Sequence, residues 1–151
     1  SDSLKAAYAG ALQGGDPQRG AGIFWGNASA QCVRCHAIDD YGGNVGPRLN
    51  GVATRLTREQ LLEALIEPSV RIAPGYGIVT LELKDKRKIN GVLQGETPEG
   101  YRVKVGNSPD TLVKKSDVAG RVNAPSAMPP MHLLLSKKEI RDVVGFLASL
   151  K

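Results

Sequence analysis

The sequence has few aromatic residues, only two cysteines and no long hydrophobic run. Its 151 residues include 1 Trp, 2 Phe, 4 Tyr and 2 Cys. Because aromatic side chains are scarce, Leu, Ile, Val and Ala must build the core unless a large flat cofactor fills part of it. No apolar stretch approaches the length of a membrane-spanning helix, so no membrane span is predicted. The length suits one well-buried domain, or one domain that carries an inserted module.

The sequence also lacks a strong excess of one charge. The 20 Lys and Arg residues and 15 Asp and Glu residues give a formal net charge of +5. The richest basic stretch, "LKDKRK", is short and is followed by charges of both signs, which is typical of a solvated surface. Nucleic acid is therefore not a predicted partner. The chain starts at Ser1 without a charged and apolar leader, and we expect it to be a processed or excised fragment.

Helix-capping signals predict three helices. Asp16 as N-cap and Pro17 at the first helical position indicate a helix over the following ten residues. A Thr-x-x-Gln capping box predicts a second helix from Thr57, and a Ser-x-x-Glu box predicts a third from Ser136. Residues 1–15 end in Gly-Gly and are predicted to be a linker or the tail of an upstream region.

The period of the apolar residues changes from helical to alternating at Gly77. Val79, Leu81 and Leu83 then fall on one face of a strand, and further alternating segments follow with turn signals between them. Residues from 78 to about 118 are therefore predicted to form a small antiparallel β-sheet module, 78–118, inserted into a helical chain.

Both cysteines lie beside one of the two histidines, in "QCVRCHAIDD". A thioredoxin-like dithiol would lie between a strand and a helix, whereas a predicted helix precedes Cys32 and a glycine-rich loop, residues 39–55, follows Cys35. This loop is predicted to lack regular structure. A structural zinc site needs about four ligands, and the chain has only 2 Cys and 2 His in total. A disulfide across two residues has strained geometry.

Covalent haem attachment gives all three side chains of this motif a role. Cys32 and Cys35 would form thioethers with the haem vinyl groups, and His36 would be the proximal iron ligand. One covalently attached haem c is therefore the predicted cofactor. A ligating imidazole donates its other ring N–H to a carbonyl, and the carbonyl of Pro47 is the candidate acceptor.

These residues resemble class I cytochromes c. "GDPQRGAGIF" and "DVVGFLASLK" are similar to the N-terminal and C-terminal helices of that family, and "EQLLEALIEPSVRIAPGYG" is similar to its middle helix. "GPRLNGVATR" resembles the loop whose proline carbonyl holds the proximal histidine and whose arginine, here Arg55, binds in the haem propionate region. The resemblance implies a mainly α class I cytochrome c fold over residues 16–151, interrupted by the β module. Arg48 and Tyr76 are further candidates for the propionate region, without support from a motif.

The sixth iron ligand is expected late in the chain. Where the compact family members place their methionine, this sequence has Ile78, and the β module follows. Met128, in "AMPPMHLLL", falls where the family has its Met-Pro ligand, and Met131 is the alternative, with apolar packing as its other role. His132 is expected to be a solvent-exposed loop residue, and ligation of the iron by two histidines is the remaining alternative.

The resemblance implies a monohaem c-type cytochrome domain that transfers one electron at a time, with His36 and Met128 as axial ligands. Such a domain is an electron carrier and makes no bond in a substrate. A haem-based ligand sensor and a peroxidase-like haem enzyme, each with a labile sixth ligand, remain as alternatives.

A second resemblance, to a bacterial haem-binding domain often appended to larger dehydrogenase-like proteins, implies a redox partner protein or a fused dehydrogenase domain. Because thioether haem is attached after export in bacteria, the implied location is periplasmic or otherwise extracytoplasmic. The β module could cover a haem edge, bind a partner or have no specific role.

Overall fold

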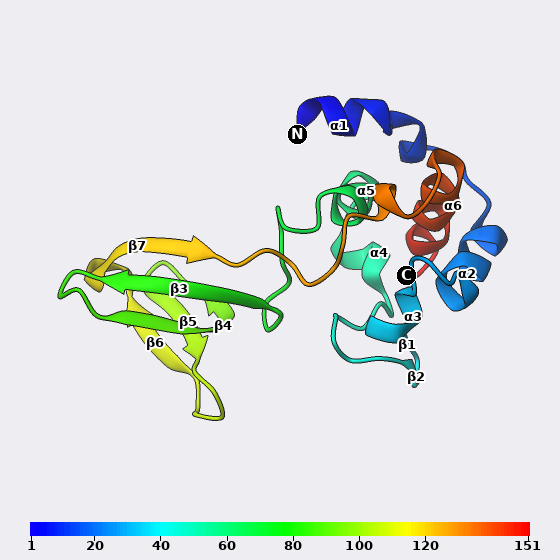
Figure 1. Ribbon diagram of the computed structural model, residues 1–151. Helices are drawn as coiled ribbons and strands as arrows, with labels where there is room; N and C mark the ends of the chain where they lie inside the picture. Colours follow the sequence, from blue (N-terminus) through cyan, green and yellow to red (C-terminus); the bar gives the residue numbers. More distant parts are fainter. The chain divides into compact units, whose positions relative to one another are not determined.

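The computed structural model describes all 151 residues. The chain divides into two compact units, unit 1 (Ser1–Arg71 and Met128–Lys151) and unit 2 (Ile72–Ala127) (Figure 1). Helices make up 36% of the residues and strands 23%. The prediction of a mainly α, class I cytochrome c fold is therefore wrong. Most of the strand residues belong to a five-stranded antiparallel sheet in unit 2, and this sheet has a hydrophobic core of its own.

Unit 1 is helical apart from one very short hairpin. Its elements are α1 (Asp2–Ala7), the 3-10 helix η1 (Ala9–Leu12), α2 (Pro17–Gly26), α3 (Cys32–Cys35), β1 (Ala37–Ile38), β2 (Tyr41–Gly42), α4 (Val52–Arg55), α5 (Arg58–Ile66), the 3-10 helix η3 (Met131–Leu133) and α6 (Lys137–Ala148). The prediction that residues 39–55 lack regular structure is wrong, because β2 and α4 lie within them. The turn of α4 forms where Val52 enters the core of the unit.

The three predicted helices begin at their predicted caps. The side chain of Asp16 accepts hydrogen bonds from the first turn of α2. Thr57 and Gln60 form both halves of a capping box at the start of α5, and Ser136 and Glu139 do the same for α6. Each box satisfies two backbone groups that a helix end would otherwise leave unpaired.

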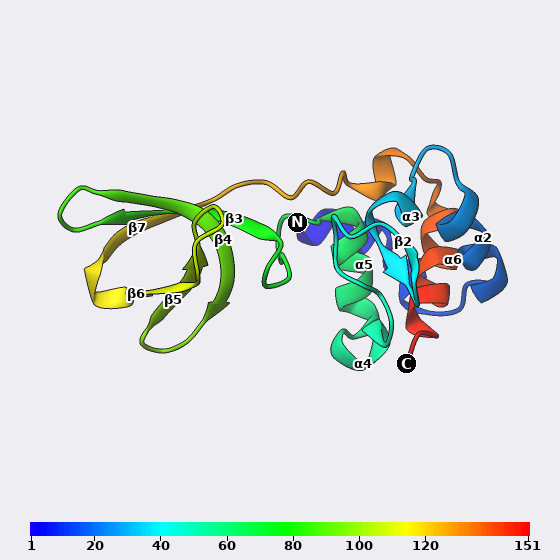
Figure 2. The ribbon, with the colours of Figure 1, turned by 90° about the horizontal axis from the view of Figure 1, so that it is seen from below.

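Helices α2 and α6 pack closely against each other (Figure 2). A Cβ atom at Gly20 would lie 2.0 Å from the carbonyl oxygen of Asp142, so only glycine permits this approach. The rings of Phe24 and Phe146 meet beside it, with their centroids 5.8 Å apart. The buried side chains of the unit come chiefly from α5 and α6 and include Leu61, Leu62, Leu65, Ile66, Ile140, Val143, Val144 and Leu147.

Residues 1–15, predicted to be a linker or an upstream tail, belong to unit 1. Leu4 and Tyr8 pack against its core, and Ala11 is buried in it. The ammonium group of Lys5 donates a hydrogen bond to the carboxylate of Glu63 on α5. Apolar contact and an ion pair therefore attach α1 and η1 to the helices that follow.

Unit 2 contains one antiparallel sheet. Its elements are β3 (Gly77–Leu83), β4 (Lys88–Glu96), β5 (Gly100–Lys104), β6 (Thr111–Lys114), the 3-10 helix η2 (Lys115–Asp117) and β7 (Val118–Asn123). The strand order is β6-β5-β4-β3-β7. The sheet extends beyond the predicted region 78–118 because β7 returns to pair with β3.

The core of unit 2 lies on one face of this sheet. Val79, Leu81 and Leu83 are buried, as their alternation predicts, and Val103 of β5 packs with them.

None of the helices in the chain is both long enough and apolar enough to cross a membrane.

Candidate functional site

The two cysteines lie on α3, a helix of a single turn. The amide of His36 donates to the carbonyl of Cys32 over 2.9 Å and closes this turn. Residues at i and i+3 share one side of a helix, so the thiols of Cys32 and Cys35 lie on the same side. Both are free and half-buried. His36 then leaves the turn in an extended conformation.

The imidazole of His36 is held by the loop that follows. Its Nδ1 lies 2.7 Å from the carbonyl oxygen of Pro47. A carbonyl can only accept a hydrogen bond, so Nδ1 carries the proton and Nε2 has the lone pair that a metal ion requires. The structure thus brings together the histidine and the proline that the sequence paired.

Gly46 allows the loop to lie against this ring. A Cβ atom at position 46 would lie 2.6 Å from Cε1 of His36 and 2.9 Å from Nδ1. The amide of Gly46 donates to the carbonyl of Cys35 over 2.8 Å, and the amide of Gly43 donates to that of Val33 over 2.9 Å. Sequence reasoning singled out Pro47 and Arg55 in this loop but not Gly46, although its position directly before Pro47 was the available signal.

Arg55, predicted to bind in the haem propionate region, supports the same loop. Its guanidinium donates to the carbonyl of Asn50 over 2.8 Å and to that of Arg48 over 3.2 Å. The side chain of Arg48 is exposed and donates to Asn50. Tyr76, the third candidate for that region, lies in unit 2, where it is 45% exposed.

The two methionines differ in their burial. Met131 is only 3% exposed and belongs to the core of unit 1, whereas Met128 is half-buried and packs at the edge of that core. The expectation that His132 is solvent-exposed is wrong. Its ring is half-buried and makes an edge contact with Tyr8, with the ring centroids 5.9 Å apart, because the single turn of η3 directs it toward η1.

The electrostatics of the cysteine turn disfavour disulfide exchange by Cys32. Burial raises the pKa of the Cys32 thiol; a backbone hydrogen bond lowers it in part, and Cys35 adds a smaller upward contribution. A thiol that stays protonated at neutral pH is a poor nucleophile for disulfide exchange. No group of three or more His, Cys, Asp or Glu side chains lies close enough to hold a metal ion, so a structural zinc site has no ligand set.

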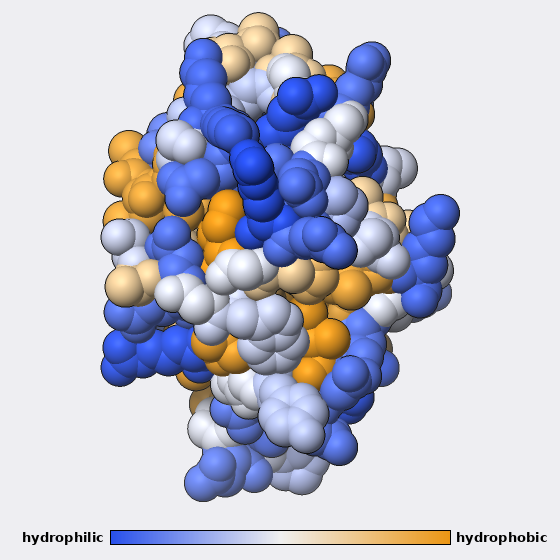
Figure 3. All heavy atoms as spheres, turned by 90° about the vertical axis from the view of Figure 1, so that its right-hand side faces the viewer, coloured by the Kyte–Doolittle hydropathy of each residue, from blue (hydrophilic) through white to orange (hydrophobic).

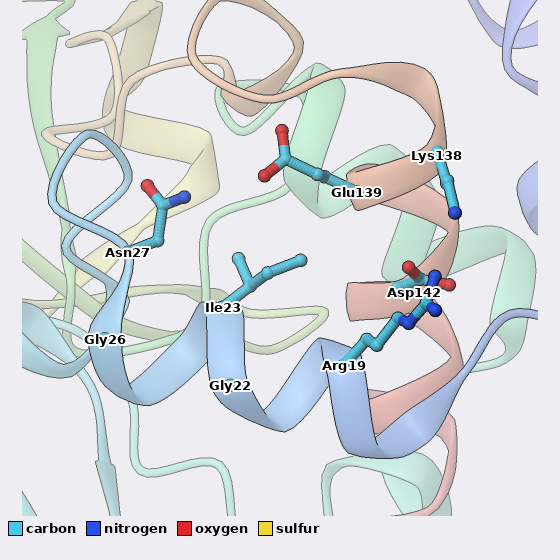
Figure 4. A pocket seen from close by; sticks show the side chains of 8 residues that line it. All are labelled: Arg19, Gly22, Ile23, Gly26, Asn27, Lys138, Glu139 and Asp142. Atoms are coloured by element: carbon cyan, nitrogen blue, oxygen red, sulfur yellow. The ribbon is translucent and has the colours of Figure 1, made fainter.

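Two surface features lie outside this constellation. An open pocket between α2 and α6 is lined by Arg19, Gly22, Ile23, Gly26, Asn27, Lys138, Glu139 and Asp142, none of them a predicted site residue (Figure 4). Near the cysteine turn, Tyr41 and Val45 of the glycine-rich loop are 72% and 63% exposed. Figure 3 shows one face of the molecule, on which hydrophobic side chains appear in small patches among hydrophilic ones.

Comparison with known proteins leaves the family open. No protein-family model and no curated protein matches the chain. A crystal structure of SoxXA from P. pantotrophus matches with 26% sequence identity over 92% of this chain and 84% of that chain, at a TM-score of 0.47. A TM-score of this size does not establish a shared fold.

Proposed function

We propose that unit 1 binds one covalent haem c through Cys32, Cys35 and His36 and that the protein carries single electrons. The observation that supports this most directly is the 2.7 Å hydrogen bond from Nδ1 of His36 to the carbonyl of Pro47, directly after the cysteine turn. A histidine that binds a metal ion through one ring nitrogen characteristically donates the N–H of the other to a carbonyl or carboxylate. The free thiols on the same side of α3 add the two attachment points.

Each residue of the site has a distinct role in this proposal. The thiols of Cys32 and Cys35 would hold the haem through thioethers, and Nε2 of His36 would bind the iron. Bound haem supplies an iron that alternates between the ferric and ferrous states. Pro47 fixes the tautomer of His36 and makes its Nε2 more basic.

Met128 is the proposed sixth ligand. A thioether is a soft donor that raises the reduction potential of haem iron, as an electron carrier requires. Burial supports Met128 over Met131, because the side chain of Met131 fills the core of unit 1 while that of Met128 lies at the edge of this core. Arg55 is proposed to support the loop of Pro47 and to bind in the haem propionate region.

The partner and the location are proposed from the same chemistry. An electron carrier needs a donor and an acceptor, and we propose a redox partner protein or a dehydrogenase domain fused to this chain. Because bacteria attach thioether haem after export, we propose a periplasmic or otherwise extracytoplasmic location.

Covalent attachment can be tested directly. The chain is produced behind an export leader in bacteria that possess haem-attachment machinery, and the purified protein is analysed by mass spectrometry and by haem staining after denaturation. The expected result is the mass of one haem added to the chain, lost when Cys32→Ala and Cys35→Ala are combined. A wild-type chain that emerges from this host without covalent haem would contradict the proposal.

A further inference from the structure

Asn50 connects the loop of Pro47 to the segment that follows His36. Its Oδ1 accepts a hydrogen bond from the backbone amide of Asp39 over 2.7 Å and one from Nε of Arg48 over 2.8 Å. Its Nδ2 donates to the carboxylate of Asp39 over 2.9 Å. Only this orientation of the amide serves all three partners, because reversing it would place Nδ2 against two donors.

The position of the Pro47 carbonyl depends on the residues that follow it. Proline has no N–H with which to fix itself. The next three residues are anchored instead, since the amide of Leu49 donates to the carbonyl of Ala37 over 2.9 Å and Arg55 holds two carbonyls of the loop. Asn50 adds a side-chain connection from this loop to Asp39, in the segment that follows His36.

The other end of the connection is equally local. Asp39 lies three residues after His36 and has a φ of 57°, in the left-handed region. Its backbone amide and its carboxylate are both bound by Asn50. Asn50 therefore adds a side-chain connection to the backbone hydrogen bonds that join the segment of His36 to the segment that carries the acceptor of its Nδ1 proton.

We propose that Asn50 is a positioning residue that sets the reduction potential of the iron by maintaining the hydrogen bond between His36 and Pro47. This inference rests on the proposed haem binding. A strong hydrogen bond at Nδ1 makes Nε2 a more basic ligand, and a more basic ligand favours the ferric state. Loss of Asn50 releases the loop, weakens this bond and favours the ferrous state.

The test compares Asn50→Ala with Asn44→Ala in the haem-loaded protein. Asn44 lies in the same glycine-rich loop, is exposed and makes no side-chain hydrogen bond, so it controls for truncation of an amide. Loss of about one net hydrogen bond corresponds to a roughly fivefold change in the ferric–ferrous equilibrium. We expect the midpoint potential of Asn50→Ala to rise by about 40 mV, at 59 mV per tenfold change, and that of Asn44→Ala to stay unchanged.

A second readout separates positioning from a merely structural role. In the diamagnetic ferrous protein, the Nδ1 proton of His36 gives an NMR signal whose exchange with solvent depends on the bond to Pro47. This exchange should become about fivefold faster in Asn50→Ala, in line with the equilibrium change. A variant that binds haem but retains the wild-type potential and exchange rate would overturn the proposal.

An exchange of the two partners provides the rescue. Asp39→Asn combined with Asn50→Asp keeps one amide and one carboxylate in contact and preserves the net charge, and asparagine tolerates the left-handed backbone at position 39. The double variant should return the potential and the exchange rate toward the wild-type values, whereas no recovery would count against the proposal. Failure of haem binding itself would appear earlier, as a wild-type chain without covalent haem.

Discussion

At the scale of single residues, the two candidate methionines differ in how deeply they are buried. Met131 is 3% exposed and surrounded by the helices of unit 1, so its side chain contributes to folding. Met128, which is separated from Met131 by two prolines, is half-buried at the edge of that core. The side chain of Met131 fills the core, so burial favours Met128 as the proposed ligand.

The two methionines are therefore expected to respond differently to truncation. In the haem-loaded protein, Met128→Ala should abolish the far-red absorption band that methionine sulfur gives with ferric iron, because the sixth ligand is lost. Met131→Ala should keep this band but lower the free energy of unfolding by about 2–5 kcal/mol through the cavity that it leaves. Denaturant titration and the ferric spectrum measure both effects.

The reverse pattern, with the band lost only in Met131→Ala, would assign ligation to Met131 instead. A wild-type ferric spectrum of high-spin type would show an open sixth position, as the sensor and peroxidase alternatives require. The two variants and the wild-type spectrum thus separate ligation by Met128, ligation by Met131 and an open sixth position.

The sequence contained enough information for part of the site. Cys32, Cys35 and His36 form a recognised attachment pattern, and the resemblance of the Gly-Pro loop pointed to Pro47, so the sequence predicted the hydrogen bond between His36 and Pro47. The bonds of Asn50 to Asp39 could not be predicted in this way, since they join residues eleven positions apart through the exact path of two turns. The role of Arg55 in supporting the loop depends on the same path.

At the scale of elements, the close approach of α2 and α6 requires a residue without a Cβ atom at position 20. A Cβ at Gly20 would meet both the carbonyl oxygen of Asp142, at 2.0 Å, and Cβ of Phe146, at 2.7 Å. The buried carboxylate of Asp142 accepts a hydrogen bond from the amide of Asp16 over 2.8 Å, which ties the start of α2 to the same place.

Gly20→Ala is therefore expected to lower the free energy of unfolding by about 1–3 kcal/mol, because backbone atoms of α6 would have to move. Gly22→Ala is the matched control in the same helix. A Cβ at Gly22 meets nothing within 4 Å, and replacing a helical glycine by alanine gains about 1 kcal/mol. Equal stability of the two variants in denaturant titrations would show that the crossing is not limiting.

The helices were predictable because their starts are encoded by neighbouring residues, such as the capping boxes at Thr57 and Ser136. The last strand, β7, was not predictable in this way. In β7 the residue that pairs with the buried Leu81 is the exposed Arg121, so the apolar alternation that marks β3 is absent. Its pairing with β3 spans about 40 residues of chain, and no local pattern encodes such a contact.

At the scale of the molecule, the fold class was mispredicted because the motifs all lie in unit 1. Unit 2 has its own core around Leu81 and Val103. Ion pairs with Glu96 also connect parts of its sheet. Arg121 of β7 donates to Glu96 of β4 over 3.1 Å, Lys115 donates to the same carboxylate over 2.9 Å, and both cations lie over the ring of Tyr101. The alternating pattern predicted these strands as an inserted module, but not that the module has a hydrophobic core of its own.

The two units are expected to lose stability at opposite ends of the pH range. In unit 2, the hydrogen bond from Lys115, with a further contribution from Arg121, lowers the pKa of Glu96. Its stabilising contribution is complete above the ordinary glutamate pKa of about 4.3 and is lost as the pH falls through the lowered value. In unit 1, the hydrogen bond to Glu63 raises the pKa of Lys5. That contribution is complete below about pH 10.4 and is lost as the pH rises through the raised value.

Two neutral variants isolate these contributions. Glu96→Gln should destabilise unit 2 at pH 7, and the difference from wild type, followed by circular dichroism of the sheet in denaturant, should shrink below about pH 4. Lys5→Met should destabilise unit 1 at pH 7, followed by fluorescence of Trp25, the single tryptophan of the chain, with the difference shrinking above about pH 11. Both differences should also decrease in high salt, because these charges are partly exposed. If either difference stayed constant across its pH limit, the ion pair concerned would not contribute to stability, and apolar packing alone would hold that unit together.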